Sequence, residues 1–189
     1  MRNAAATKER ILAAATAEFV EHGIAGARVD RIAAAATSNK AQLYAYFGNK
    51  DALFDAIFTA HVTANVDAVP LTADDLPDYA VRLYDAYLHD PALVRLVTWA
   101  RLERTPTGDL FVGWPDHDEA KLAQLADAQA AGVLVDDLAL TDLWSMVISL
   151  AGTWAQASIT WTASPDEAEV DHDRRRTALA RTVRRAFCR

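Results

Sequence analysis

The chain has 189 residues, of which 52% are hydrophobic and 24% charged, with 7 Gly and 6 Pro. This composition is typical of a folded globular protein and excludes a disordered or fibrous chain. The single cysteine, Cys188, excludes an intrachain disulfide framework and a cysteine-rich zinc site. The first ten residues lack the apolar run of a secretory signal, so we expect a cytoplasmic protein. We also expect no metal and no cofactor.

The formal net charge of −7 hides three regions of different sign. Residues 1–50 hold seven Lys or Arg and four acids, residues 51–173 hold five basic and twenty-two acidic residues, and residues 174–189 hold seven Arg and no acid. A basic N-terminal region on an acidic body suggests a module that faces an anion such as a phosphate backbone. Taken alone, such a run of charge is more often only a solvated face.

The abundance of Ala, Leu and Arg and the near absence of alternating apolar residues predict an all-α fold of about nine helices. The expected helices cover residues 7–21, 30–36, 40–47, 49–66, 78–88, 91–104, 116–130, 141–162 and 165–187. Gly23 is placed to end the first helix, and Asn39 and Asn49 are placed to cap the third and fourth. The first four helices are expected to form a compact unit.

The stretch from Leu143 to Ala163 has no charged residue over 21 positions, which raises the question of a membrane span. Ser and Thr interrupt it at intervals and neither flank has a Lys or Arg anchor close by, so we reject that interpretation. We expect this helix to pack against its own domain on one face and against a second subunit on the other, with the last helix beside it. A monomeric core is the alternative.

Residues 32–54 form the most informative segment, because they predict a short helix, a tight turn and a second short helix. Apolar residues that can pack inward are Ile32, Ala33, Ala36, Leu43 and Phe47, whereas Lys40, Gln42, Tyr46 and Lys50 can face out. A helix of this kind fits the major groove of DNA, where residues near its N-terminus reach base edges. Gln42 suits a base, with adenine preferred, Lys40 suits guanine or a phosphate, and Tyr46 and Lys50 suit the backbone phosphates.

This segment resembles the tetracycline-repressor (TetR) family of regulators over roughly residues 7–55. The resemblance depends on the run Leu43-Tyr44-Ala45-Tyr46-Phe47 followed by Asn49-Lys50-Asp51-Ala52-Leu53, and on Gly23 at the end of the leading helix. It implies an N-terminal module that binds operator DNA and a divergent helical C-terminal domain that dimerises and binds a small ligand. The positions that then correspond to DNA contacts are Lys40, Ala41, Gln42, Tyr44, Tyr46 and Lys50.

The chain departs from the family pattern at two places. The family usually has Gly-Val-Ser in the turn, where this chain has Thr37-Ser38-Asn39. We expect a less tightly packed turn, because Thr37 lacks the conformational freedom of glycine and Ser38 removes a small apolar plug. Arg28 stands where a Thr or Ser often caps the second helix, which removes a cap and adds a candidate phosphate contact.

Aromatic residues in the C-terminal part predict a pocket for a small apolar or aromatic effector. The candidate lining residues are Tyr84, Trp99, Phe111, Trp114 and Trp144, although any one of them alone is more often a core residue. Nothing in the sequence selects a polar anchor among His61, Arg101, Glu103 and Gln156. The acidic clusters around His117 and His172 fit solvated surface better than a metal site, because neither contains an i, i+4 His pair.

These patterns favour a transcriptional regulator with a DNA-binding domain at residues 1–50 and a ligand-binding and dimerisation domain at residues 51–189. We expect a repressor that binds a pseudo-palindromic operator as a homodimer and that a ligand releases by tilting the fourth helix. The alternative is a helical small-molecule-binding protein that has lost DNA binding, which the altered turn suggests. The sequence has no catalytic motif, so we do not expect an enzyme.

Overall fold

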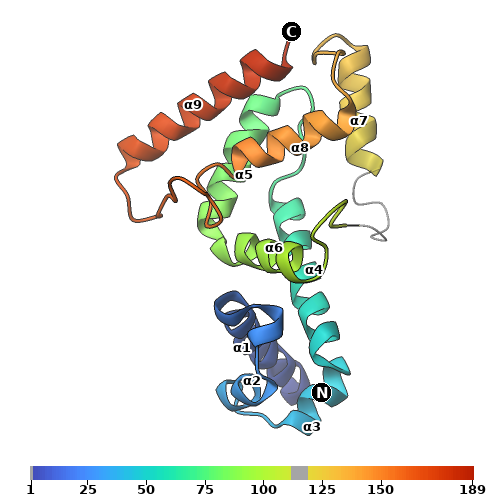
Figure 1. The fold of residues 1–189 in the computed structure, drawn as a ribbon, viewed down its shortest axis with the longest axis vertical. Coiled ribbons are helices and arrows are strands. Elements are labelled where there is room, and N and C mark those ends of the chain that lie inside the picture. Colours follow the sequence, from blue (N-terminus) through green and yellow to red (C-terminus); the bar gives the residue numbers. More distant parts are fainter. Residues whose placement is uncertain (1, 112–118) are drawn as a thin grey trace. The chain divides into compact units, whose positions relative to one another are not determined.

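The computed structural model describes residues 2–111 and 119–189, and over these residues the chain folds into nine α-helices without a β-strand (Figure 1). The all-α class and the number of helices expected from the sequence are therefore confirmed for the described residues. The chain divides into two compact units. Unit 1 comprises residues 1–64 and 92–110, and unit 2 comprises residues 65–91 and 111–189.

Unit 1 contains α1 (Arg2–Gly26), α2 (Val29–Ala35) and α3 (Lys40–Phe47), with most of α4 (Lys50–Ala68) and of α6 (Pro91–Glu103). Its core is made of apolar side chains at helical spacing. The phenylalanine rings of α1 and α4 meet there, with Phe19 edge-on to Phe54 at 5.2 Å between centroids and Phe54 stacked on Phe58 at 5.8 Å. The other side chains with no or almost no exposure in this core are Ile11, Ala15, Ile32, Leu43, Leu53, Ile57 and Leu96.

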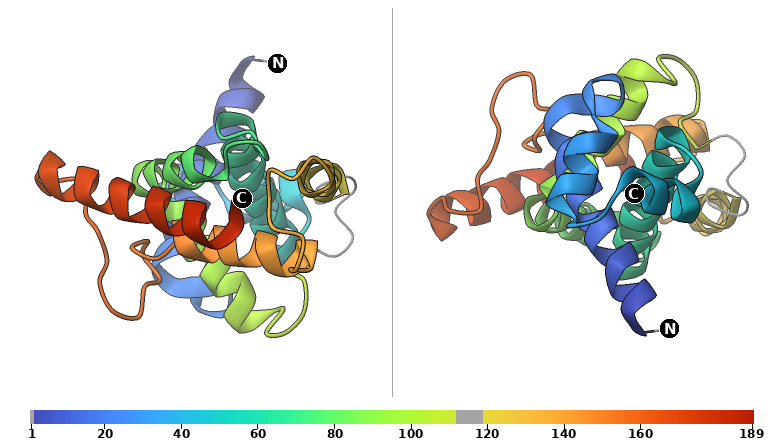
Figure 2. Two further views of the ribbon diagram at one scale, coloured as in Figure 1. Left: turned by 90° about the horizontal axis from the view of Figure 1, so that it is seen from above. Right: turned by 90° about the horizontal axis from the view of Figure 1, so that it is seen from below.

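Unit 2 contains α5 (Leu76–His89), α7 (Glu119–Ala130), α8 (Leu140–Ala151) and α9 (Glu169–Phe187). Helix α5 packs against both α8 and α9, and α5 and α9 lie side by side in Figures 1 and 2. Asp75 caps α5, since its carboxylate accepts the Asp78 N–H. The core between these helices contains Leu76, Leu83, Tyr84, Leu125, Leu143, Val147, Leu179, Val183 and Phe187.

The long helix expected at residues 141–162 is wrong, because α8 ends at Ala151. Gly152 follows the helix, and the chain then forms turns in which the Ala163 N–H donates to the Trp154 carbonyl at 2.9 Å. Hydroxyls of Ser145 and Ser149 donate to carbonyls four residues earlier, a pattern that weakens helices. Glycine and repeated Ser and Thr therefore end the helix where the absence of charge suggested that it continues.

The other helices lie close to their expected positions, with shifts at their ends. Helix α1 is longer than expected at both ends and breaks at Gly23, where φ is 72° and ψ is −176°. Helix α9 begins at Glu169 rather than near Pro165. The expected start of the seventh helix at Asp116 lies outside the described residues, which resume with α7 at Glu119.

The two compact units do not meet at residue 50, where the sequence analysis places the boundary between the two functional domains. Most of α4 and α6 belong to unit 1 with the first three helices, and both helices connect directly to unit 2. Among the described residues, no helix is long and apolar enough to cross a membrane.

Candidate nucleic-acid interface

The turn between α2 and α3 is a helix C-terminal motif with a threonine in the left-handed region. The Ser38 N–H donates to the Ala33 carbonyl at 2.9 Å and the Thr37 N–H to the Ala34 carbonyl at 3.1 Å, the two bonds of a Schellman motif. Thr37 occupies the residue with positive φ, at 50°, which usually favours glycine. The turn thus forms without glycine, and the cost of the left-handed conformation is about 1–2 kcal/mol.

Asn39 caps α3, as the sequence predicts. Its backbone is extended and its Oδ1 accepts the Gln42 N–H at 2.8 Å, which satisfies one of the free donors of the first turn. Leu43 is fully buried and anchors the helix to unit 1. Lys40, Ala41 and Gln42 consequently lie exposed in the first turn, the part of a recognition helix that reaches base edges.

Lys40 is held by the preceding helix. Its Nζ lies 2.8 Å from Asp30 Oδ1 on α2, and this hydrogen bond raises the pKa of Lys40. The Lys40 side chain is 52% exposed and that of Asp30 is 75% exposed. An ion pair with this exposure contributes little to stability, so the lysine can exchange Asp30 for a phosphate or a base at little cost.

Arg28 is exposed directly before α2 and contributes no side-chain cap to that helix. The missing cap is replaced from α1, because Glu18 accepts the Arg28 N–H at 2.8 Å and also the Arg31 Nε at 2.7 Å. Burial disfavours the charged form of Glu18, but the hydrogen bonds from Arg31 and from the Arg28 N–H outweigh burial and lower its pKa. The backbone of Arg28 is therefore held by Glu18, while its side chain is exposed.

The two tyrosines of α3 differ in exposure. Tyr44 is 43% exposed, whereas Tyr46 is half-buried with its ring edge-on to Phe47 at 6.3 Å between centroids. A tyrosine held in this way can present its hydroxyl to a phosphate. Lys8 of α1 lies over the other ring of the pair, with Nζ 5.8 Å from the Phe47 centroid.

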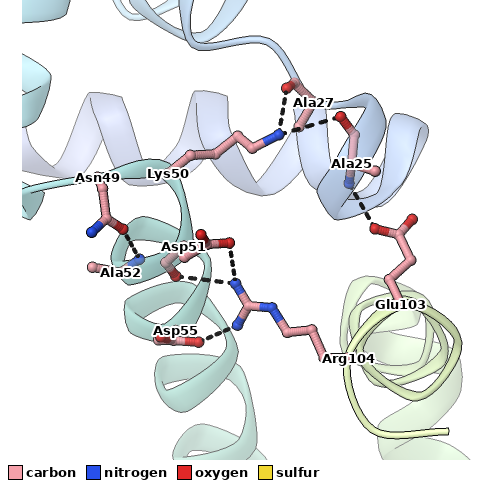
Figure 3. A network of polar contacts seen from close by, with 9 residues as sticks. All are labelled: Ala25, Ala27, Asn49, Lys50, Asp51, Ala52, Asp55, Glu103 and Arg104. Carbon is pink, nitrogen blue, oxygen red and sulfur yellow. Dashed lines mark hydrogen bonds and ion pairs between the residues drawn. The ribbon is translucent and has the colours of Figure 1, made fainter.

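Lys50, at the start of α4, contacts the end of α1. Its Nζ donates to the carbonyls of Ala25 and Ala27, both at 3.2 Å (Figure 3). A cation is favoured at the C-terminal end of a helix, so this contact stabilises the junction between α1 and α2. The ammonium has three N–H donors, which leaves one beyond these two bonds for an anion such as phosphate.

Helix α6 supplies partners for the backbone groups at the break in α1. The Val20 carbonyl accepts Arg95 Nε at 3.0 Å and Trp99 Nε1 at 3.2 Å. The Ala25 N–H donates to Glu103 Oε2 at 2.6 Å (Figure 3). A break leaves helical backbone groups that need partners, and α6 provides them on both sides of Gly23.

The residue after α6, Arg104, joins the same region to α4. It forms ion pairs with Asp51, at 2.8 Å, and with Asp55 (Figure 3). Its guanidinium also lies 4.6 Å from the centroid of the Phe54 ring. An arginine that bridges two carboxylates and covers an aromatic ring fixes geometry more firmly than a single surface pair. Helices α1, α4 and α6 are therefore tied together within unit 1.

The predicted ligand-lining residues have different surroundings in the structure. Tyr84 is buried and contacts Trp154 and His172, and its hydroxyl lies 2.7 Å from His172 Nδ1. Trp144 is half-buried and stacks on Tyr79 at 5.9 Å between centroids. Both belong to the core of unit 2.

The other three candidates have different positions. Trp99 lies in unit 1, where its indole N–H contacts α1, so the structure gives it a packing role there. Phe111 is half-buried at the start of the second segment of unit 2, and Trp114 lies outside the described residues. Of the polar anchors considered, Glu103 contacts Ala25 and Arg101 donates to the Thr105 and Gly108 carbonyls, whereas His61 is half-buried and Gln156 exposed.

The expectation that the cluster around His172 is solvated surface is wrong for the histidine itself. His172 is 3% exposed, because α9 turns it toward Tyr84 of α5, and its neighbours Asp171 and Asp173 form ion pairs with Arg174 and Arg176. The cluster around His117 lies outside the described residues, apart from Glu119. No group of His, Cys, Asp and Glu in the described parts of the chain could hold a metal ion.

The sequence did not reveal several residues that contact α1, α2 and α3 from positions far away along the chain. Asp30, Glu18 and the α6 residues Arg95 and Glu103 all act on backbone or side chains of the first three helices. Their partners lie up to 78 residues away along the chain, so no local pattern reveals them. The only local signal was Gly23, which marks the break that α6 covers.

Two family descriptions match the chain. Residues 11–57 match "Bacterial regulatory proteins, tetR family" and residues 75–185 match "Tetracyclin repressor-like, C-terminal domain". The first region contains the helices of the candidate interface, and the second lies almost entirely in α5 to α9.

Three relatives extend this similarity over about three quarters or more of the chain. The HTH-type transcriptional repressor SCO4008 of Streptomyces coelicolor is 40% identical over 156 residues, which are 82% of this chain and 80% of that protein. The repressor NicS of Pseudomonas putida is 27% identical, over 76% of this chain and 73% of its own. The solved structure of the transcriptional regulator SCO4942 of S. coelicolor is 38% identical with a TM-score of 0.77, covering 96% of this chain and 98% of that one.

Proposed function

Because the chain belongs to the TetR family of bacterial DNA-binding transcriptional regulators, we propose that it is a ligand-released repressor that binds its operator as a homodimer. The observation that carries this proposal is the first turn of α3, where Asn39 caps the helix and leaves Lys40, Ala41 and Gln42 exposed. The intact turn argues against a protein that has lost DNA binding, since the departure at Thr37 and Ser38 does not disrupt α3.

The proposed DNA contacts divide by chemistry. Lys40 and Gln42 at the start of α3 are assigned to base edges, and Ala41 is assigned to an apolar contact with a thymine methyl. The remaining positions are assigned to backbone phosphates because their side chains are cationic or hydroxylic and flank α3: Arg28, Tyr44, Tyr46 and Lys50. Phosphate contacts would set the register on the duplex, and base contacts would set the sequence.

A homodimer is supported by apolar side chains that unit 2 leaves exposed. Met146 on α8 is 38% exposed and Val170 on α9 is 72% exposed, and Ile159 and Trp161 in the turns between these helices are also exposed. Large apolar residues exposed together on neighbouring elements are typical of protein interfaces. A second copy would cover them, and a two-fold symmetric dimer fits a pseudo-palindromic operator.

The proposed effector is a small apolar or aromatic molecule that binds in unit 2. Tyr84 and Trp144 in the aromatic core of that unit, with Phe111 and Trp114, are the proposed lining residues. Helices α4 and α6 each have residues in both units. A conformational change in unit 2 can therefore reach unit 1, which contains α1 and α3, along the chain itself. The effector would release DNA only if it prefers the arrangement that does not fit the operator.

The test is selection of genomic DNA fragments by the purified full-length protein at physiological salt, followed by sequencing of the retained DNA. We expect an inverted repeat to be enriched and its affinity to fall steeply with salt. A variant with Lys40→Ala and Gln42→Ala together should lose the enrichment, whereas Ser145→Ala on α8 should keep it. If wild-type protein enriched nothing and bound random DNA weakly and without salt dependence, the proposal would be refuted.

The same proposal gives the chain no catalytic role and places it in the cytoplasm with the DNA. Purified protein should also sediment as a dimer at micromolar concentration. A double change of the exposed apolar residues, Trp161→Ser with Met146→Ser, should shift it toward the monomer. The Tyr44→Phe variant, which alters α3, serves as the matched control and should leave the dimer intact.

A further inference from the structure

Ser38 is fixed on both sides by the backbone of the turn. Its own N–H completes the Schellman motif on Ala33, and the next residue, Asn39, is locked as the cap of α3. A serine between two such anchors has little freedom to move relative to the first turn of α3. Its Cβ is therefore held at a defined place beside the first turn of α3.

From that place the Ser38 hydroxyl contacts the side chain of Gln42. Ser38 Oγ donates to Gln42 Oε1 at 2.8 Å, while the Gln42 backbone N–H is taken by Asn39 Oδ1. Both the backbone and the amide oxygen of Gln42 are thus engaged by the turn. An unrestrained glutamine is flexible and loses more conformational freedom when it binds a base than one already held.

The contact also determines which end of the Gln42 amide is offered to DNA. A free glutamine donates and accepts at once, and this pairs it with adenine through N6 and N7. When the oxygen is directed to Ser38, the amide N–H donors are the atoms left to face the groove. Donors need acceptors, and guanine presents two on its major-groove edge, O6 and N7, whereas adenine presents only N7 and cytosine presents a donor.

We propose that Ser38 is a positioning residue that sets the base specificity of Gln42, turning it from adenine toward guanine. This inference rests on the proposed function, in which Gln42 contacts a base. It differs from the preference for adenine that the residue type alone predicts. Ser38 itself need not touch the DNA, because it acts through the amide oxygen of its neighbour.

The experiment is selection from a randomised inverted-repeat library by full-length wild-type protein and by four variants: Gln42→Ala, Ser38→Ala, Ser38→Thr and Ser145→Ala. The Gln42→Ala variant identifies the base pair that residue 42 contacts, because selectivity is lost there alone. At that base pair we expect wild type to favour guanine over adenine by about five-fold or more. Ser38→Ala should lower that ratio by a similar factor, toward adenine.

The controls separate positioning from a general effect on the fold. Ser38→Thr keeps the hydroxyl and should retain the wild-type preference. Ser145→Ala removes a hydroxyl on another helix, which donates to the Thr141 carbonyl at 2.7 Å, and should change nothing. In a Gln42→Ala background, Ser38→Ala should have no further effect on base preference, because the residue it positions is gone.

The outcomes distinguish this inference from the function on which it rests. If Gln42→Ala abolished selectivity at one base pair while Ser38→Ala left the guanine preference unchanged, Ser38 would have no positioning role and the repressor would stand. An adenine preference in wild type, or an unaltered preference in Gln42→Ala, would also overturn the inference. If wild type selected no sequence at all, the proposed function would fail together with it.

Discussion

Replacing Gly23 with alanine should destabilise unit 1 strongly, because this residue combines an unusual backbone conformation with close contacts. Its φ of 72° and ψ of −176° lie in a region that is almost restricted to glycine, and occupying it with alanine costs about 1–3 kcal/mol. A Cβ atom at this position would lie 2.5 Å from Glu103 Oε1 and 2.9 Å from a ring carbon of Trp99. Relieving that overlap costs about another 1–3 kcal/mol.

The two terms combine because the side chains in the way are those that hold α6 on α1. Glu103 can move aside only by releasing the Ala25 N–H, and Trp99 only by releasing the Val20 carbonyl. Each lost hydrogen bond costs about 1 kcal/mol, and these losses are part of the cost of relieving the overlap rather than an addition to it. We therefore expect Gly23→Ala to lower the free energy of unfolding by about 3–5 kcal/mol, measured by urea denaturation followed by far-UV circular dichroism.

Two other glycines provide matched controls. Gly132 also has a positive φ, of 73°, but nothing lies within 4 Å of a Cβ there, so Gly132→Ala should cost only about 1–2 kcal/mol. Gly26 lies in α1 without a positive φ, and its Cβ would be an ordinary 3.5 Å from His22 Cβ. Gly26→Ala should be neutral or stabilising by a few tenths of a kcal/mol.

The reasoning would be refuted by equal losses at Gly23 and Gly132, which would mean that α6 does not occupy the space beside the break. The free energy of unfolding of the double variant Gly23→Ala with Glu103→Ala provides a second test. Removing the Glu103 carboxylate takes away the closest contact, so the two changes together should cost clearly less than the sum of their separate effects.

Three further predictions concern charged residues of unit 1. Lys50→Met should make the plot of log DNA affinity against log salt concentration less steep by about 0.9, because the proposed phosphate contact is lost. An unchanged slope would mean that Lys50 contacts only the Ala25 and Ala27 carbonyls. Fluorescence anisotropy titrations with DNA at several salt concentrations measure the slope. Arg104→Ala should cost about 1–2 kcal/mol in urea denaturation, and Arg104→Lys should recover only part of it, because lysine cannot bridge Asp51 and Asp55 as arginine does. The pKa of Glu18 is lower in the folded state than its ordinary value of 4.5, so its ionised carboxylate stabilises the fold at a pH above 4.5. This stabilisation is lost as the pH falls from 4.5 through the lower pKa of the folded state. The melting temperature of Glu18→Gln should therefore depend less on pH below about 4.5 than that of wild type.

Local signals in the sequence located the elements of the candidate interface well. Asn39 caps α3 and Gly48 ends it with a φ of 79°, because capping and left-handed residues act within a few positions of the helix end. Leu43 is buried while its neighbours Lys40 and Gln42 are exposed, as the helical period requires. Whether Gln42 and Lys40 contact DNA stays a prediction.

Signals that depend on distant partners were not available from the sequence. The sequence offers Trp99 as a large aromatic residue for a ligand pocket, which stays a prediction, but it does not reveal that the indole N–H donates to a carbonyl 79 residues earlier in the chain. His172 was expected on an acidic surface because of Asp171 and Asp173, yet it is buried against a tyrosine 88 residues away. In both cases the residue type was informative, and the partner depended on tertiary packing.

The turn before α3 shows why a departure from a family pattern need not weaken function. Thr37 takes the left-handed conformation that glycine would adopt more easily, and the two bonds of the Schellman motif and the Asn39 cap hold it there. A valine at position 38 would fill space but could not donate a hydrogen bond, whereas Ser38 donates to Gln42 Oε1. The substitution that removes an apolar contact from the turn therefore adds a polar contact to the recognition helix. On the proposed role of Ser38, a change in the turn would alter which base Gln42 selects without any change in the residues assigned to DNA contacts.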